Sequence, residues 1–323
     1  MSDGTGSYSG VVGVAEWTDG LMVYGRDDRT TGGIWLSEDG VSWQAATVPD
    51  SPAGLVVFVT GVVRVEDQYL AFGTTGNPEG SGPVGAVLWG SDDGRVWTEL
   101  SADIPGGLLA VNGQTILVGS LWDVFPTVGD VYESHDGGST WSSVPRPGPW
   151  HLGPAIVHHG GYLLGGGVVT TSTHDSTAAI WSSRDGVEWG SRVDLEGRVI
   201  SAFASLPDGT LVALGLGQSP TDAGPVWTSS DGVAWSLASE IGTCCISNLA
   251  STPDGIVGVG FDAPASGDPG LVATTRDARS WSLTRGIEGD YQGVVYIERF
   301  GIVISGRDPA GRPAVIVGWP FGP

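Results

Sequence analysis

The chain has 323 residues and a formal charge of −22, with 36 acidic residues against 14 basic ones, all of them arginine. A surface this acidic repels phosphate backbones, which argues against nucleic acid as a partner. Glycine (54 residues) and tryptophan (14 residues) are abundant, while charged residues make up only 15%. This composition is typical of short strands joined by tight turns, and no apolar run reaches the roughly 18–20 residues of a membrane span.

A glycine-terminated strand is the first repeated feature along the chain. Residues Leu21 to Tyr24 form a short apolar run that ends on Gly25, and another apolar run, Val11 to Ala15, precedes it. The pair recurs at spacings of 45 to 49 residues, ending on Gly25, Gly73, Gly119, Gly166, Gly215, Gly260 and Gly306. A period of this length, filled by short strands, predicts radially repeated four-stranded units.

An aspartate turn is the second repeated feature, and its first copy runs from Ile34 to Trp43. Serine or threonine lies two residues before the aspartate, glycine follows it (Ala278 is the exception), and tryptophan comes four or five residues later. Aspartate binds the backbone of its own turn, and glycine accepts positive φ. The pattern therefore predicts a structural turn, not a catalytic acid, at Asp39, Asp93, Asp136, Asp185, Asp231 and Asp277.

The segment Ser134-His135-Asp136-Gly137-Gly138-Ser139-Thr140-Trp141 matches the Asp-box (bacterial neuraminidase) pattern S-x-D-x-G-x-T-W in full. The other five copies look like shortened versions. The chain thus resembles the Asp-box propellers, which include sialidases, sortilin-type receptors, xyloglucanases and a photosystem assembly factor. The resemblance spans nearly the whole chain and implies a β-propeller, but the group contains enzymes and pure binders alike.

We therefore expect an all-β fold, one seven-bladed propeller of four-stranded antiparallel blades over residues 1–323. The last unit has only three strands, and Asp3 to Tyr8 aligns with Asp136 to Trp141. Residues 2–9 are thus expected to close the last blade and remove its open edge. The alternative is a six-bladed ring with a C-terminal appendage. The expected blades are about 10–49, 54–103, 106–146, 151–195, 198–240, 244–285 and 291–320 plus 2–9.

Tryptophans that the repeat does not require indicate a first candidate site. Ten of them belong to the repeated pattern, which leaves Trp17, Trp122, Trp150 and Trp319. Trp122 and Trp150 fall in neighbouring loops on the face where propellers usually carry function. Aromatic rings beside carboxylate and imidazole groups suit a sugar, although both tryptophans would also serve to cover a loop. The candidate ligand-binding residues are Trp122, Asp123, Trp150, His151, His174 and Asp175.

Arginines and aspartates that follow the glycine-terminated strands give a second candidate cluster. Adjacent blades would bring them together, and arginine can hold a carboxylate with two hydrogen bonds. The alternative is a set of exposed ion pairs of little energetic weight, and we favour it. The residues are Arg26, Asp27, Asp262, Arg307 and Asp308.

The sequence contains few signs of a metal site, a catalytic site or a disulfide framework. The five histidines lack a recognisable metal spacing, so no metal or cofactor is expected; Ca²⁺ is an option that no specific motif supports. The sialidase Arg-Ile-Pro motif and arginine triad are missing, so no catalytic residue carries over. Cys244 and Cys245 are adjacent and are expected as two buried thiols, with a strained vicinal disulfide as the alternative.

The first functional hypothesis is a non-catalytic propeller that binds a glycan or a protein partner. The second is a glycan hydrolase or lyase at the mouth of the channel, and the third is a plain scaffold within a larger exported protein. The resemblance implies a bacterial, extracytoplasmic protein whose signal has been removed, since Met1-Ser2-Asp3 starts no signal peptide; a cytoplasmic location is the alternative. A monomer is expected.

Overall fold

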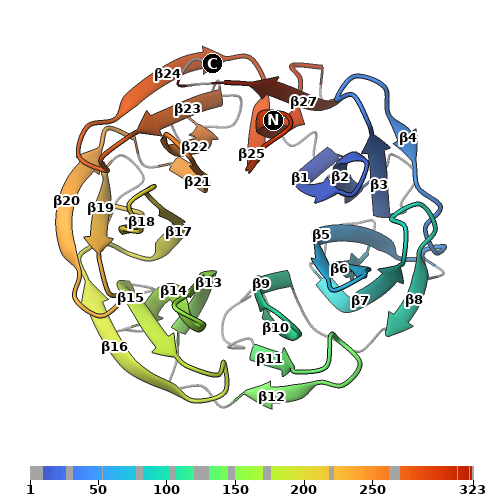
Figure 1. The fold of residues 1–323 in the computed structure, drawn as a ribbon, viewed down its shortest axis with the longest axis horizontal. Helices are drawn as coiled ribbons and strands as arrows, with labels where there is room; N and C mark the ends of the chain where they lie inside the picture. Colours follow the sequence, from blue (N-terminus) through green and yellow to red (C-terminus); the bar gives the residue numbers. More distant parts are fainter. Residues whose placement is uncertain are drawn as a thin grey trace.

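The computed structural model describes residues 10–26, 32–52, 54–77, 83–101, 107–119, 131–144, 150–169, 176–217, 222–243, 245–261, 270–310, 312–319 and 321. Its strands form seven antiparallel sheets arranged in a ring (Figure 1). The protein is a seven-bladed β-propeller, as predicted, and the six-bladed alternative is wrong. Six sheets have four strands, and the last has three within the described residues. Residues 2–9, the expected closing strand, lie outside the described part.

The innermost strands are β1 (Gly10–Trp17), β5 (Val56–Val65), β9 (Gly107–Asn112), β13 (Trp150–His158), β17 (Ile200–Ser205), β21 (Cys245–Thr252) and β25 (Asp290–Ile297). The second strands are β2 (Gly20–Arg26), β6 (Gln68–Gly76), β10 (Thr115–Gly119), β14 (Gly161–Val169), β18 (Leu211–Gly215), β22 (Gly255–Phe261) and β26 (Gly301–Arg307).

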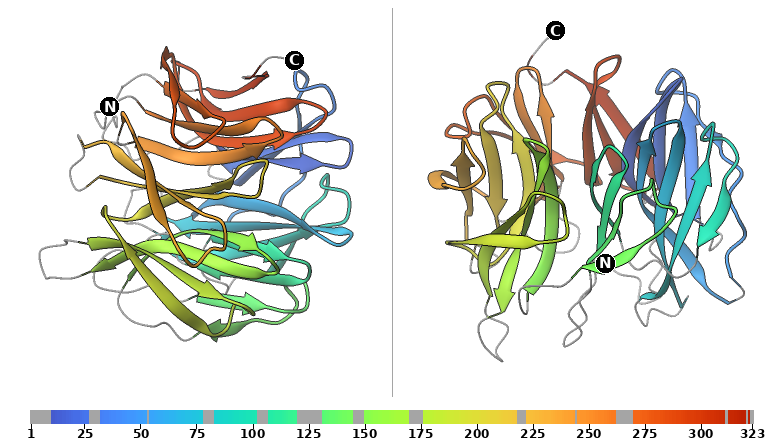
Figure 2. Two further views of the ribbon diagram at one scale, coloured as in Figure 1. Left: turned by 60° about the vertical axis from the view of Figure 1, so that its left-hand side comes forward. Right: turned by 60° about the horizontal axis from the view of Figure 1, so that its bottom comes forward.

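The third strands are β3 (Gly32–Ser37), β7 (Pro83–Ser91), β11 (Val131–Ser134), β15 (Ser176–Ser183), β19 (Gly224–Ser229), β23 (Gly270–Thr275) and β27 (Pro313–Gly318). The outermost strands are β4 (Gln44–Ala45), β8 (Thr98–Ser101), β12 (Ser142–Val144), β16 (Trp189–Leu195), β20 (Ser236–Ile241) and β24 (Ser282–Ile287). Figure 2 shows the blades standing side by side around the ring. Among the described residues, no helix has the length and apolar character that a membrane span requires.

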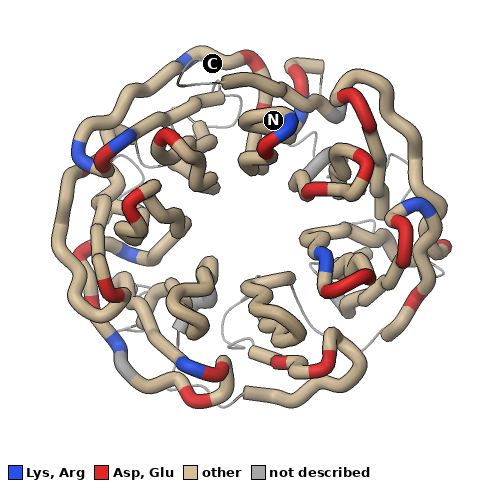
Figure 3. The backbone as a smooth tube through the Cα atoms, in the orientation of Figure 1, with Lys and Arg blue, Asp and Glu red and all other residues tan. Residues whose placement is uncertain are grey.

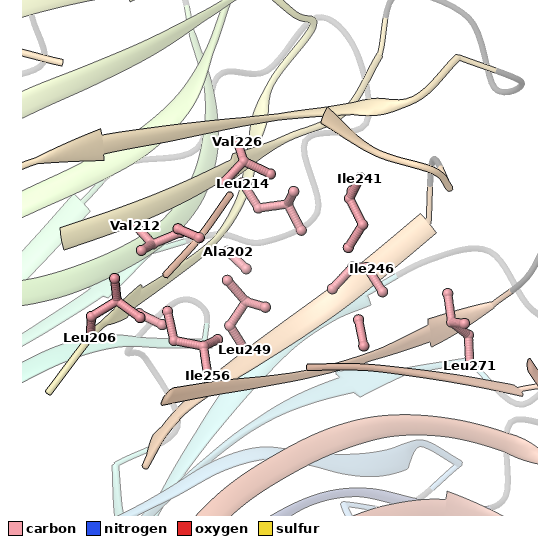
Figure 4. Close-up of a cluster of buried hydrophobic side chains, with 13 residues drawn as sticks. Ala202, Leu206, Val212, Leu214, Val226, Ile241, Ile246, Leu249, Ile256 and Leu271 are labelled. Carbon is pink, nitrogen blue, oxygen red and sulfur yellow. The ribbon is translucent and has the colours of Figure 1, made fainter. Parts of the chain in front are cut away.

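The core is divided into seven apolar clusters, one between each pair of adjacent blades. Alternate side chains of one strand enter different clusters because successive residues point to opposite faces. On β18, Val212 and Leu214 pack toward blade 6 (Figure 4), while Leu211 and Ala213 pack toward blade 4. This two-sided burial explains why the second strands are almost continuously apolar. The cluster between blades 7 and 1 closes the ring.

The aspartate turns share one hydrogen-bond pattern. In the first copy, Asp39 accepts hydrogen bonds from the backbone N–H groups of Val41 and Ser42 at 2.8 and 2.7 Å. The Ser37 hydroxyl accepts one from the Gly40 N–H at 2.8 Å. Ala278, the exception to the glycine rule, still has a positive φ of 58°. Its methyl group is fully buried between blades 5 and 6, and this burial offsets the strain.

Every innermost strand is interrupted by a β-bulge or an equivalent register shift against its neighbour. Near the bulge, a carbonyl oxygen of the innermost strand lies against one of the recurring glycines of the second strand. A Cβ at Gly73 would lie 2.6 Å from the Phe58 oxygen, and Gly260 and Gly306 face Cys245 and Asp290 in the same way. Close backbone approach therefore requires glycine at these three positions.

Cys245, at the start of β21, is disulfide-bonded, so the expectation of two thiols is wrong. Cys244, the only other cysteine in the chain, lies outside the described residues. Because the two cysteines are adjacent in the sequence, their sulfur atoms are within reach of each other whatever the fold around them.

Turns between the first and second strands tie neighbouring blades together at one end of the ring. Each tie is a hydrogen bond that crosses from one blade to the next. The pairs are Tyr69 with Thr18, Gln114 with Glu66, Asn112 with Gly160, Ser205 with Ser251, and Arg299 with Asp19. A cavity lies toward the opposite end, where the innermost strands begin.

Candidate functional site

A cavity of about 260 Å³ opens on the channel side of blades 6, 7, 1 and 2. Its walls come from β21, β25, β1, β2 and β5, near the end where the innermost strands begin. Five uncharged polar side chains line it, together with two glycines and two valines. They are Tyr24, Thr60, Ser247, Asn248 and Gln292, with Gly13, Val14, Gly293 and Val294.

The bulges explain why polar groups reach this wall. A bulge leaves one residue out of the ladder and turns its side chain in a new direction. Thr60, Ser247 and Gln292 are the extra residues of their strands. The hydroxyls of Thr60 and Ser247 each donate a hydrogen bond of 3.2 Å to a carbonyl oxygen of the second strand, at Phe72 and Val259. Ser201, in blade 5, repeats this contact with Leu214.

The two amides of the cavity are held by different partners. The Asn248 Oδ1 accepts a hydrogen bond of 2.8 Å from the Leu249 N–H. The Gln292 Nε2 donates to both carboxylate oxygens of Asp290, at 3.1 and 3.4 Å. These partners fix which polar atoms of the two amides remain for a ligand.

Tyr24 forms the side of the cavity at blade 1. Its ring lies over Gly13, where a Cβ would come too close to the hydroxyl. Burial raises the pKa of Tyr24 to about 12, while a hydrogen bond with the Val62 backbone acts in the opposite direction. The phenol therefore stays neutral over the physiological range.

Blade 7 departs from the repeat behind the cavity wall. Ser305 pairs with Gly293 as Tyr24 pairs with Gly13 and Phe72 with Gly61. The other four blades have leucine or valine at this position, so a small hydroxyl replaces an apolar or aromatic side chain in blade 7. The Ser305 Oγ is fully buried and has no hydrogen-bond partner among the described residues.

The first sequence-predicted cluster is only partly within the described chain. Trp150 and His151 begin β13, where they pair with Val168 and Gly167. Trp122, Asp123, His174 and Asp175 lie outside the described residues. The cluster therefore stays a prediction.

The structure describes three of the five residues in the second predicted cluster. Arg26 lies over the Phe58 ring of blade 2, with its Cζ 5.1 Å from the ring centroid. Arg307 ends β26. Asp308 belongs to its own turn, where it pairs with Arg312 at 2.6 Å, and this pairing lowers its pKa. Asp27 and Asp262 lie outside the described residues.

Besides Trp150, the leftover tryptophans within the described residues are Trp17 and Trp319. Trp17 is buried between blades 1 and 2, so it is structural. Trp319 is half-exposed beside Tyr296, with ring centroids 6.3 Å apart.

Sequence reasoning did not identify the cavity residues. A usable signal was present, because the bulged residue is polar in blades 2, 5, 6 and 7. The acidic residues, by contrast, are spread around the whole ring (Figure 3) and indicate no site by themselves.

The fold and the cavity define a seven-bladed β-propeller with a neutral polar pocket on its channel. No protein-family profile matches the sequence, and no curated protein matches it. Among solved structures, the chain is similar to YCF48 bound to D1 peptide, with a TM-score of 0.62 and 12% identity over 96% of this chain and 92% of that one.

A chain of the mitotic checkpoint complex is similar with a TM-score of 0.63 and 10% identity, over 99% of this chain and 91% of that one. An Aleuria aurantia lectin bound to Fucα1-6GlcNAc gives a TM-score of 0.47 and 12% identity, over 88% and 97%. At such identities the likeness is one of fold alone.

Proposed function

We propose that this propeller binds a glycan in the pocket on its channel, without turning it over. The observation that carries the proposal is the lining, in which five uncharged polar side chains surround a cavity of about 260 Å³. Ligand pockets typically combine apolar walls with a few placed polar groups. Val14 and Val294 back the cavity from the clusters between blades, where their side chains are buried.

A glycan hydrolase or lyase is the alternative. A hydrolase needs two carboxylates roughly 5–9 Å apart, and a lyase needs a base beside a group that neutralises charge. Neutral amides and hydroxyls orient a ligand instead, and we therefore rank binding first. A protein partner is the other option within the binding class.

We further propose that Trp122 and Trp150 extend the glycan site at the same end of the channel. This rests on the sequence: the strand before Trp122 ends at Gly119, and Trp150 begins β13. Rings placed at a channel mouth stack on additional sugar units.

The hydrogen-bonded turns support an Asp-box propeller, and the disulfide at Cys245 supports an oxidising, extracytoplasmic compartment.

The test is a glycan-array screen of the wild type beside an Asn248→Ala/Gln292→Ala variant and a Trp122→Ala/Trp150→Ala variant. Gln44→Ala, an exposed glutamine on β4, is the matched control. We expect the wild type and the control to bind the same glycans, with binding lost in the first variant and reduced in the second. Binding that survives Asn248→Ala/Gln292→Ala would remove the pocket from the proposal. An array without any bound glycan would overturn glycan binding, and release of reducing ends from a bound glycan would replace binding by hydrolysis.

A further inference from the structure

The hydroxyls of the pocket have already used their only hydrogen. A serine or threonine hydroxyl donates once and accepts through its lone pairs. Because Thr60 and Ser247 donate to the Phe72 and Val259 carbonyls, they present acceptors to the cavity. The same contact at Ser201 shows that it belongs to the bulge itself. The polarity of these two groups is therefore fixed by the backbone.

The orientation of Gln292 is fixed by a carboxylate. A carboxylate accepts hydrogen bonds and donates none, so Asp290 selects the Nε2 side of the amide. The Gln292 Oε1 is then the atom left for a ligand, and it is a third acceptor. Asp290 also anchors the bulge, since its carbonyl oxygen lies against Gly306.

Two donors complete the set. Asn248 uses its Oδ1 on the Leu249 N–H, which leaves its Nδ2 hydrogens. Tyr24 stays protonated and has its own O–H hydrogen. The pocket thus offers three acceptors and two donors, and none of its described lining side chains carries a charge.

We propose that this pocket selects neutral sugars over the corresponding sugar acids, and that Asp290 is the positioning residue for that choice. The inference rests on the proposed glycan binding and names its ligand class. Each sugar hydroxyl both donates and accepts, so it suits a mixed set of partners. A carboxylate supplies no donor, leaves acceptors of the pocket unpaired, and enters a protein of charge −22.

The experiment measures affinity for matched pairs of oligosaccharides by calorimetry. The pairs differ only at C6: galactose against galacturonate, glucose against glucuronate, and mannose against mannuronate oligomers. For each sugar that binds, we expect the neutral oligomer to bind at least tenfold more tightly than its acid, a difference of about 1.4 kcal/mol in binding free energy. An acid that binds equally or more tightly overturns the selectivity while glycan binding stands. If no oligomer of either kind binds, both proposals fail.

Two variants test the residues. Asp290→Asn lets the Gln292 amide turn over and donate into the pocket, so we expect the neutral-to-acid affinity ratio to fall at least threefold. Gln292→Glu places a carboxylate beside Asp290, and we expect it to weaken both members of the pair. Asp50→Asn, an exposed aspartate outside the pocket, removes the same charge and should leave the ratio unchanged. An unchanged ratio in Asp290→Asn, with an unchanged melting temperature, would remove Asp290 from its role.

Discussion

The indole N–H of Trp17 donates a hydrogen bond of 2.9 Å to the carbonyl oxygen of Asp93. Trp17 ends the innermost strand of blade 1, and Asp93 begins the aspartate turn of blade 2. The Arg95 guanidinium covers the same indole, with its Cζ 4.6 Å from the ring. One side chain thus joins two successive blades at the end of the ring that carries the ties between blades.

Trp17→Phe should lower the free energy of unfolding by about 1 kcal/mol, because it removes the hydrogen bond and keeps most of the packing. Trp17→Ala should cost about 3–5 kcal/mol, as expected for a buried tryptophan. Urea denaturation measures both. Trp319→Phe, at a half-exposed position, is the control and should change little.

Gly306→Ala should destabilise blade 7 by about 2 kcal/mol or more, because the added Cβ would meet the Asp290 oxygen and lie 2.6 Å from the Tyr291 Cα. Gly318→Ala, in the same blade, adds its Cβ to open space and should stay within about 0.5 kcal/mol of the wild type. Thermal unfolding of the two variants distinguishes them. Equal stability would mean that the bulge adjusts freely around the glycine.

Asp136 should make stability depend on acid pH. A hydrogen bond from the Thr140 hydroxyl, at 2.6 Å, and one from the Thr140 N–H, at 2.8 Å, lower the pKa of Asp136 to about 2. A lowered pKa stabilises the fold above the ordinary value near 4 and loses this effect as pH falls toward 2. Asp136→Asn should therefore be less stable than the wild type at neutral pH, with a difference that shrinks between about pH 4 and 2. The same substitution at Asp50, outside any aspartate turn, provides the reference.

Tyr24 should make stability depend on alkaline pH. Because burial raises its pKa to about 12, its neutral form is favoured in the folded state. The stabilisation is complete below about pH 10 and is lost as pH rises toward 12, by at most about 2–3 kcal/mol. The difference between the wild type and Tyr24→Phe isolates this residue from Tyr162 and Tyr291, whose pKa values burial also raises. A constant difference from pH 9 to 12 would contradict the assignment.

The ring could be predicted from the sequence because its marks are local. Glycine at the end of a second strand and aspartate in a turn each report a backbone requirement within one blade. Even the exception at Ala278 was visible, although only the structure shows the buried methyl group that compensates its positive φ.

The pocket could not be predicted, because it depends on contacts between blades. Thr60 and Ser247 are ordinary strand residues in the sequence, and only the bulges turn them toward a shared cavity. Of the tryptophans that the repeat does not require, Trp17 is buried between blades, which its sequence position alone does not reveal. Asp308 pairs with Arg312 four residues later, as in the exposed ion pairs that we favoured for the second cluster.

The pocket takes its walls from both ends of the chain, with Tyr24 and Thr60 on one side and Ser247 and Gln292 on the other. The pocket exists only while blades 7 and 1 remain packed together, so a bound ligand contacts both sides of the interface between these two blades. By mass action, any ligand that binds at this interface opposes the separation of blades 7 and 1. Binding in the pocket and closure of the ring are therefore coupled, and a ligand adds a reversible link to the apolar cluster and the Arg299–Asp19 hydrogen bond that join blades 7 and 1.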